Sequence, residues 1–199
     1  LKLVNFGEYF MTKKIIYYAT GNTGKFAEVK RYIQEFAPQI ELKQLDNDFP
    51  EIQTMDQRAI ALDKAKQAYA KINAPVLIDD SGIYFEKYKN FPGTLTKFIY
   101  HGIGYEGLLK LAENSRATFL LYMLYTEKPG IHFLFEGKCE GKIVRPESFE
   151  TQPGLPYDAI FLPDGSEKTY AQLRGTPQEH EFAYRLRAIK KFVEWYLGR

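Results

Sequence analysis

An apolar run that breaks into a glycine turn and then a helix constrains the fold of this chain most. Residues 15–19 read IIYYA, and Thr20-Gly21-Asn22-Thr23-Gly24-Lys25 follows directly. The run predicts a buried strand at residues 14–19. A helix is expected over residues 24–36, because its apolar residues share one stripe: Phe26, Val29, Ile33 and Phe36. Such a turn presents backbone N–H groups and the Lys25 ammonium to an anion, so the sequence predicts an anion site here.

The following residues continue the alternation of strands and helices. We expect a strand at 41–45 and a strand at 75–79 that is buried on both faces. Between them, Thr54-Met55-Asp56-Gln57 has the spacing of a capping box, which predicts a helix from there to about residue 72. This order of strand, helix, strand, helix and strand predicts that the three strands form the parallel part of a sheet.

The second half predicts mainly antiparallel strands and a final helix. A short helix is expected at 104–113, and strands at 117–126, 131–139, 141–144 and 158–162. The first two of these strands should form a hairpin around Lys128-Pro129-Gly130. Thr176 as cap, Pro177 at the first helical position and Glu179 closing a capping box predict a helix start. Its buried stripe would be Phe182, Leu186, Ile189, Val193 and Tyr196. Together the elements predict an α/β fold with a mixed sheet.

Composition bounds the class of protein. The chain has 199 residues, 45% of them hydrophobic, enough for one large domain or two lobes with a real core. Its 27 Lys and Arg balance 25 Asp and Glu, which argues against a broad nucleic-acid footprint. Cys139 is the only cysteine, so no intrachain disulfide is possible, and this fits a reducing compartment such as the cytoplasm.

The chain shows no sequence signal for a membrane. No apolar run approaches the roughly 20 residues that a membrane helix needs. The first ten residues, LKLVNFGEYF, lack the basic start and long apolar centre of a signal peptide. Because Met11 followed by Thr12-Lys13-Lys14 resembles a natural start, we expect residues 1–10 to be an extension and residues 11–199 to form one domain.

Charged residues after two predicted strands are the candidates for chemistry. Asp79 and Asp80 lie at the end of a predicted buried strand, and Lys25 follows another predicted strand. On a regular strand the two carboxylates point to opposite faces, unless Ser81-Gly82 bends the strand. A bound Mg²⁺ would allow carboxylates to act as ligands, as a base or as both. Glu51 is a further carboxylate, just before the predicted second helix.

Each of these residues also has an ordinary structural interpretation. Lys25 and Lys64 are equally consistent with solvated surface lysines, and Asn22 with a residue that stabilises its turn. Glu51 could simply be a loop carboxylate near a helix start, where a negative charge is favourable. Asp80-Ser81-Gly82 also has the composition of an ordinary turn. His101, His132 and His180 show no metal-ligand spacing, and Cys139 in a strand favours packing over nucleophilic chemistry.

The dispersed motifs resemble the inosine triphosphate pyrophosphatase family over nearly all of residues 13–197. They occur in family order and are Thr20-Gly21-Asn22 with Lys25 and Glu28, Glu51-Ile52-Gln53, Asp79-Asp80-Ser81-Gly82, Phe91-Pro92-Gly93, Arg116-Ala117, Tyr157-Asp158 with Ile160-Phe161, and Pro163, Gly165 and Lys168-Thr169. Several motifs in order are far more specific than one glycine turn.

The resemblance implies a fold, an activity and residue roles. It implies an elongated mixed sheet with flanking helices in two lobes around a central cleft, and a homodimer. It implies Mg²⁺-dependent hydrolysis of ITP, dITP and XTP to the monophosphate and pyrophosphate. Asn22, Lys25 and Lys64 would contact phosphates, Glu51, Asp79 and Asp80 would hold or orient the metal, and Asp80 would activate water. Thr20, Ser81, Tyr157, Asp158, Tyr184 and Arg185 would complete the nucleotide site.

Departures from the family pattern cluster in the half of the site that would read the base. Leu155 stands where an aromatic residue would stack on the base, Ala183 and Tyr184 replace a serine and a histidine, and Glu179 replaces a lysine. Because base stacking contributes about 1–3 kcal/mol, affinity or base preference should change. We expect Glu179 to act as a helix cap. His180 lies four residues before Tyr184 and could partly replace the missing histidine.

Two alternatives therefore remain beside the enzyme of altered purine nucleotides. One keeps the reaction and shifts or relaxes the base preference. The other is a non-catalytic nucleotide-binding protein, against which the retained Glu51, Asp79 and Asp80 argue, because binding alone needs no group that activates water.

Overall fold

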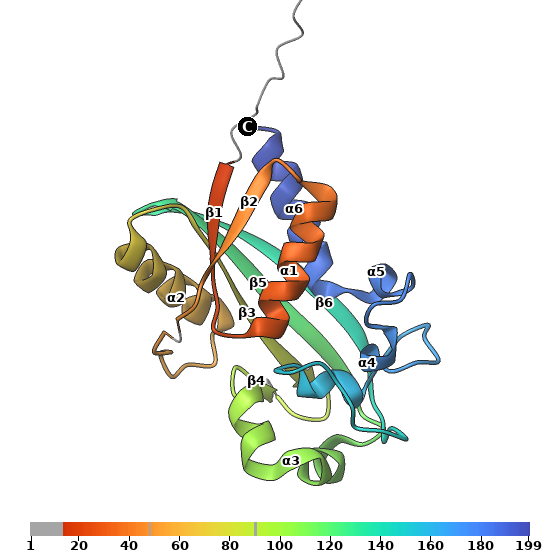
Figure 1. Cartoon of the computed structure of the whole chain (residues 1–199). Coiled ribbons are helices and arrows are strands. Elements are labelled where there is room, and N and C mark those ends of the chain that lie inside the picture. The colour runs from red at the N-terminus through yellow and green to blue at the C-terminus, as the bar shows by residue number, and fades with distance from the viewer. Residues whose placement is uncertain (1–13, 48, 90) are drawn as a thin grey trace, which may run out of the picture.

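A mixed sheet forms the centre of the protein in the computed structural model, which describes residues 14–47, 49–89 and 91–199 (Figure 1). Within these residues, the sheet has seven strands: six follow the order β2-β1-β3-β5-β6-β7, and the seventh, β4, pairs with β3. The strands are β1 (Lys14–Ala19), β2 (Ile40–Leu45), β3 (Val76–Phe85), β4 (Pro92–Gly93), β5 (Arg116–Lys128), β6 (Ile131–Ile143) and β7 (Phe161–Pro163). β1 pairs in parallel with β2 and β3, and the remaining pairs are antiparallel. The predicted α/β fold with a mixed sheet is confirmed.

Helices cover both faces of this sheet. They are α1 (Thr23–Phe36), α2 (Gln57–Ile72), α3 (Thr96–Ala112), α4 (Tyr170–Leu173), α5 (Glu179–Phe182) and α6 (Tyr184–Leu197), together with the 3-10 turn η1 (Pro156–Ala159). α1 and α6 lie on one face of the sheet and α2 on the other (Figure 1). No helix among the described residues is long and apolar enough to cross a membrane.

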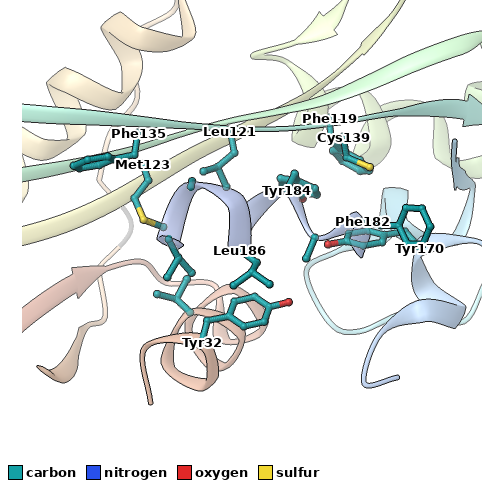
Figure 2. Packing of buried hydrophobic residues seen from close by; sticks show 14 of the residues in the cluster. Tyr32, Phe119, Leu121, Met123, Phe135, Cys139, Tyr170, Phe182, Tyr184 and Leu186 are labelled. Atoms are coloured by element: carbon teal, nitrogen blue, oxygen red, sulfur yellow. The ribbon is translucent and has the colours of Figure 1, made fainter. Parts of the chain in front are cut away.

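Two hydrophobic clusters follow from the alternation of side chains along β3. Leu77 and Ile83 pack with α1 and α6, whereas Val76 and Ile78 pack with α2. Figure 2 shows the first cluster, with Tyr32 of α1 and Leu186 of α6 packed beneath β5. The second cluster is lined by the small residues Ala61, Ala65 and Ala68 of α2. The predicted stripe of the last helix is confirmed for Leu186, Ile189 and Val193, which are buried in α6; Tyr196 is half-buried, and Phe182 is buried but belongs to α5.

The predicted hairpin is confirmed, but several predicted boundaries are wrong. Lys128 pairs with Ile131 across the turn, and β6 continues through residue 140 as one strand instead of two. α3 begins eight residues earlier than predicted, and its backbone leaves the helical region at Gly104, with φ 59° and ψ −169°. Glycine adopts this conformation at no steric cost, so α3 continues past the break. Asp158 lies in η1 rather than in a strand, and β7 begins only at Phe161.

Both predicted capping boxes are wrong. Asp56, not Thr54, caps α2: its Oδ1 accepts hydrogen bonds from the backbone N–H groups of Arg58 at 2.9 Å and Ala59 at 3.2 Å. The Thr176 hydroxyl donates backwards to the carbonyl oxygen of Leu173. The long last helix begins at Tyr184 instead. The predicted extension, residues 1–10, lies outside the described residues.

Candidate active site at the end of strand β1

The candidate site lies where β3 continues past the end of β1. β1 pairs with β3 only through Tyr17–Val76 and Tyr18–Leu77, so Asp79 and Asp80 lie beyond this pairing. The chain leaves β1 at Ala19 and enters α1 at Thr23, which places Lys25 in the first turn of α1. The Lys25 Nζ atom lies 3.3 Å from Asp79 Oδ1. The structure therefore brings the predicted lysine and one predicted carboxylate into contact.

Asn22 holds the turn between β1 and α1. Its Oδ1 accepts a hydrogen bond from the backbone N–H of Lys25 at 3.0 Å, which caps α1. Its Nδ2 donates to the carbonyl oxygen of Gly154 at 3.0 Å. The hydroxyl oxygen of Thr20 accepts from the backbone N–H of Asn22 at 3.1 Å. Asn22 and Thr20 thus order the turn, and Asn22 also fixes the distant loop at residue 154.

Asp79 is buried on the α1 and α6 face between two cations. Besides Lys25, it accepts a hydrogen bond on Oδ2 from Arg185 Nε at 2.8 Å. Burial opposes the charged form, but Lys25 and Arg185 outweigh it and hold the pKa of Asp79 well below its usual value. Burial lowers the pKa of Lys25, and Asp79 offsets this in part. Asp79 is therefore ionised and fully paired in this structure.

Asp80 lies on the opposite face of β3, toward α2. The alternation predicted for a regular strand is confirmed, because β3 stays paired with β5 through Ser81 and Gly82 and does not bend there. Lys64 Nζ lies 2.8 Å from Glu51 Oε1 and 3.6 Å from Asp80 Oδ1. Burial raises the pKa of Asp80, while the charge of Lys64 lowers it, and the net shift is upward. Glu51, Lys64 and Asp80 therefore form a second cluster.

Gln57 anchors this second cluster to the sheet. The side chain is buried at the start of α2, and its Nε2 donates to the carbonyl oxygen of Asp80 at 2.9 Å. Its Oε1 accepts from the Tyr84 hydroxyl at 2.8 Å. The sequence suggested Gln57 only as part of a capping box and not as a site residue, because a glutamine at a helix start does not indicate a contact with a strand. It fixes Asp80 relative to α2, which also carries Lys64.

The chemistry of the donor set fits a hard divalent cation at Glu51 and Asp80. Two carboxylate oxygens already approach one cation there, the Lys64 ammonium. Among the residues that the structure describes, no group of three or more His, Cys, Asp or Glu could hold a metal ion by itself. Mg²⁺ often takes only one or two carboxylates and completes its shell with water and substrate phosphates. The oxygens of Asp79, in contrast, are occupied by Lys25 and Arg185.

The predicted residues of the base-reading half are all buried or half-buried. Asp158 and Arg185 are almost completely buried, and the Tyr157 hydroxyl donates to the carbonyl oxygen of Thr96 at 2.9 Å. The ring of Tyr184 stacks on Phe119, with centroids 4.8 Å apart. Ser81 is half-buried on the same face of β3 as Asp79. Arg185 Nη2 is buried with no hydrogen-bond partner among the described residues, so it retains donors for another acceptor.

Buried ion pairs that the sequence did not predict connect these residues. Arg185 Nη1 donates to Glu28 Oε2 at 2.5 Å, and Arg174 Nη1 lies 2.7 Å from Glu28 Oε1. Arg174 Nε donates to Asp158 Oδ2 at 2.9 Å. These pairs join residues that are far apart in the sequence, so no local pattern reveals them. Glu28, Asp158 and Arg185 were named from the family resemblance, whereas nothing in the sequence pointed to Arg174.

Glu179 belongs to the same buried group and is not the helix cap that we expected. It accepts hydrogen bonds from the Arg31 guanidinium at 2.8 and 2.9 Å, from the Tyr32 hydroxyl at 2.9 Å and from the backbone N–H of Gly175 at 2.9 Å. Burial opposes ionisation, but these contacts lower the pKa of Glu179. His180 lies outside this group, against Tyr32 and Phe36 and 3.6 Å from Glu35 Oε2.

Comparisons with known proteins concern the family and the fold. The family model described as the Ham1 family matches residues 16–195. A protein named dITP/XTP pyrophosphatase from Methanopyrus kandleri is 34% identical over 184 residues, which cover 91% of this chain and 95% of that protein. A protein of the same name from Pyrococcus horikoshii is 36% identical, with 90% and 95% covered. The structure of a HAM1 protein from Coxiella burnetii matches with a TM-score of 0.72 over 94% of this chain and 100% of that one, at 20% identity, which concerns the fold alone.

Proposed function

Because this chain belongs to the Ham1 family, in which similar proteins are named dITP/XTP pyrophosphatases, we propose that it hydrolyses ITP, dITP and XTP to the monophosphate and pyrophosphate. This activity removes deaminated purines from the nucleotide pool. One observation carries the proposal: two clusters, each with a lysine and a carboxylate, lie on the two faces of β3 just beyond the end of β1. Phosphoanhydride hydrolysis needs such a combination of cations and a base.

Asp80 is the proposed general base. The attacking water forms a bond to the α-phosphorus, the bond from that phosphorus to the bridging oxygen breaks, and pyrophosphate leaves with its electron pair. The water proton passes to the carboxylate of Asp80. A pKa raised by burial suits this role, because a base is most effective when its pKa approaches the working pH.

Lys25 and Lys64 are the proposed phosphate contacts. Both ammonium groups are paired with carboxylates in this structure, at 3.3 Å for Lys25 with Asp79 and 2.8 Å for Lys64 with Glu51. A triphosphate offers each lysine a more highly charged partner. The lysines then stabilise the negative charge that grows on the leaving pyrophosphate.

Mg²⁺ is the proposed cofactor, with Glu51 and Asp80 as its ligands. When bound, it would neutralise phosphate charge and acidify water. Of the three metal residues expected from the sequence, Asp79 is better suited to orienting Lys25 and Arg185, which occupy its two oxygens. We also propose the two-lobed shape with a cleft, the homodimer and the cytoplasmic location that the sequence led us to expect.

A shifted or relaxed base preference is the second candidate, and the buried base-reading half favours it. Leu155 is only 6% exposed, and Tyr184 is stacked on Phe119. Leu155 has no ring to stack on a base, and the ring of Tyr184 is buried against Phe119. The reaction would be unchanged in this case, because Asp80 and the two lysines lie elsewhere.

A panel of triphosphates tests the proposal. Pyrophosphate release is measured with and without Mg²⁺ for ITP, dITP, XTP, ATP, GTP, dUTP and dTTP. We expect Mg²⁺-dependent release with ITP and XTP well ahead of ATP and GTP. Release from all purines alike would support the relaxed preference. No release from any nucleotide by folded protein would contradict the proposed function and favour a nucleotide-binding protein.

A further inference from the structure

Six charged side chains alternate in sign from the phosphate half of the site to the base-reading half. We call them the ion chain, and their order is Lys25, Asp79, Arg185, Glu28, Arg174 and Asp158. Successive contacts measure 3.3, 2.8, 2.5, 2.7 and 2.8 Å. All except Lys25 have side chains that are at most 3% exposed. Buried charges are costly unless each has a partner of opposite sign, so the ion chain stabilises one arrangement of the elements that carry it.

Arg174 is the branch point of the ion chain. It ends α4, and its guanidinium reaches three carboxylates in different directions. Nη1 lies 2.7 Å from Glu28 Oε1 and 3.4 Å from Glu179 Oε1, whereas Nε and Nη2 lie 2.9 and 2.8 Å from Asp158 Oδ2. The Tyr170 ring lies 4.4 Å from the guanidinium carbon. This side chain therefore has little freedom to move.

Asp158 connects Arg174 to the loop that faces the start of α1. Asp158 lies in η1, which follows directly on the loop at residues 151–155. The carbonyl oxygen of Gly154 in that loop accepts the hydrogen bond from Asn22. A side chain on Gly24 would meet the carbonyl oxygen of Pro153 at 2.6 Å, so the loop and α1 are in close contact. The position of Asp158 therefore affects the position of the loop that contacts the turn between β1 and α1.

We propose that Arg174 is a positioning residue that sets base discrimination without touching the nucleotide. It holds Asp158, and with it the loop at residues 151–158, at a fixed place relative to Glu28 of α1. This inference rests on the proposed function. Position 179, where the family resemblance leads us to expect a lysine, carries Glu179 instead, and the cation beside Asp158 is Arg174, which follows α4.

The electrostatics of Asp158 support this role. Burial raises the pKa of Asp158, Arg174 and Arg185 oppose this and Glu28 adds to it, and the net pKa is about 6. Without Arg174, the buried carboxyl would be predominantly protonated at neutral pH and would lose its strongest anchor. The phosphate half should change much less, because Asp79 keeps Lys25 and Arg185 as partners.

The test compares Arg174→Met with the wild type and with Arg145→Met. Arg145 is the matched control, since it forms exposed ion pairs with Glu106 and Glu113, neither of which belongs to the ion chain. We measure kcat and KM for ITP and ATP with Mg²⁺, and the inhibition constant of inorganic tripolyphosphate, which has no base. Arg174→Met should lower the ratio of kcat/KM for ITP over ATP by about tenfold or more, mainly through KM for ITP. The inhibition constant and the control variant should be unchanged.

Three results would overturn the inference. The first is an unchanged ITP-to-ATP ratio in folded Arg174→Met. The second is an equal loss for both nucleotides with a weaker inhibition constant, because a merely structural role predicts that pattern. If Arg174→Met does not fold, Arg174→Lys is measured instead. One ammonium cannot contact Asp158 and Glu28 together as the forked guanidinium does, so the ratio of kcat/KM for ITP over ATP should still fall. An unchanged ratio in Arg174→Lys is the third result.

Failure of the proposed function would be recognised separately. If the wild type releases no pyrophosphate from any nucleotide, the proposed function is wrong. Calorimetric dissociation constants for ITP and ATP then test Arg174 alone. A loss of preference for ITP in Arg174→Met supports the inference, and equal preferences in variant and wild type overturn it.

Discussion

At the scale of single residues, Asp79 and Asp80 are adjacent in sequence and opposite in character. Asp79 has a lowered pKa and two cationic partners, whereas Asp80 has a raised pKa and shares one lysine with Glu51. The alternation of a strand produces this difference, because neighbouring side chains enter different environments. The two residues should therefore respond differently to the same substitution.

Asp80→Asn should abolish activity without weakening the fold. Removing the base should lower kcat by about 10²–10⁴-fold. Because the pKa of Asp80 is raised in the folded protein, ionisation of Asp80 lowers the stability of the fold at pH values above the ordinary aspartate pKa near 4. The uncharged amide in Asp80→Asn should therefore leave the free energy of unfolding at pH 7 unchanged or increase it. Steady-state kinetics and urea unfolding test this. A large loss of stability with activity retained would contradict it.

Asp79→Asn should instead weaken the fold. The substitution removes the counter-charge of Lys25 and leaves Arg185 with Glu28 alone, and breaking a buried ion pair typically costs about 3–5 kcal/mol. The folded pKa of Asp79 is depressed, so its contribution is present above about pH 4 and is lost as pH falls further. Urea unfolding of both proteins between pH 3 and pH 8 is the measurement. The expected difference in the free energy of unfolding between wild type and variant shrinks as the pH falls, and a difference that grows would contradict this prediction.

At the scale of elements, α1 packs closely against the loop at residues 151–155, with no room for a side chain at Gly24. Gly24→Ala should raise KM, because the added Cβ would lie 2.6 Å from the carbonyl oxygen of Pro153 and must displace the loop. Small displacements of positioning groups can cost up to about 10²-fold in rate. Gly102→Ala in α3, with no atom within 4 Å of its Cβ, is the control. Equal kinetics for the two variants would show that the loop is not needed.

How far the sequence predicts these elements depends on whether the information is local. The apolar run of β1 and the stripe of α1 were predictable, because periodicity and turn residues are local properties. The extension of β3 past Asp79 was not, since Ser81-Gly82 resembles a turn, and pairing with β5 and β4 continues the strand to Phe85. Thr176 and Glu179 had the spacing of a cap, but Arg31, Tyr32 and Arg174 recruited Glu179 into the buried ion pairs.

The site divides in the same way. The phosphate half follows from motifs at the two strand ends, and the structure brings Lys25 to Asp79 and Lys64 to Asp80. The base-reading half depends on Arg174 and Glu28, whose partners lie as far as 157 residues away along the chain. Contacts of this kind are set by how the helices pack on the sheet, and no spacing in the sequence encodes them.

At the scale of the whole molecule, ligand binding should be linked to thermal stability. Lys64 lies between Glu51 and Asp80, so Mg²⁺ alone must compete with its ammonium, whereas a triphosphate draws Lys64 away. Mg²⁺ with tripolyphosphate at about 100 times the dissociation constant should add about 2.7 kcal/mol, or raise the melting temperature by roughly 5–10 °C. Mg²⁺ alone should add much less. Calorimetric melting measures this, and a full shift with Mg²⁺ alone would contradict it.

The identity of the products tests the central claim most directly. ITP is incubated with the protein and Mg²⁺, and the reaction is followed by phosphorus NMR, with a chelated sample beside it. The proposed chemistry predicts that IMP and pyrophosphate appear together in equal amounts and that the chelated sample stays unchanged. IDP with inorganic phosphate, or intact ITP in the presence of folded protein and Mg²⁺, would contradict hydrolysis between the α- and β-phosphates.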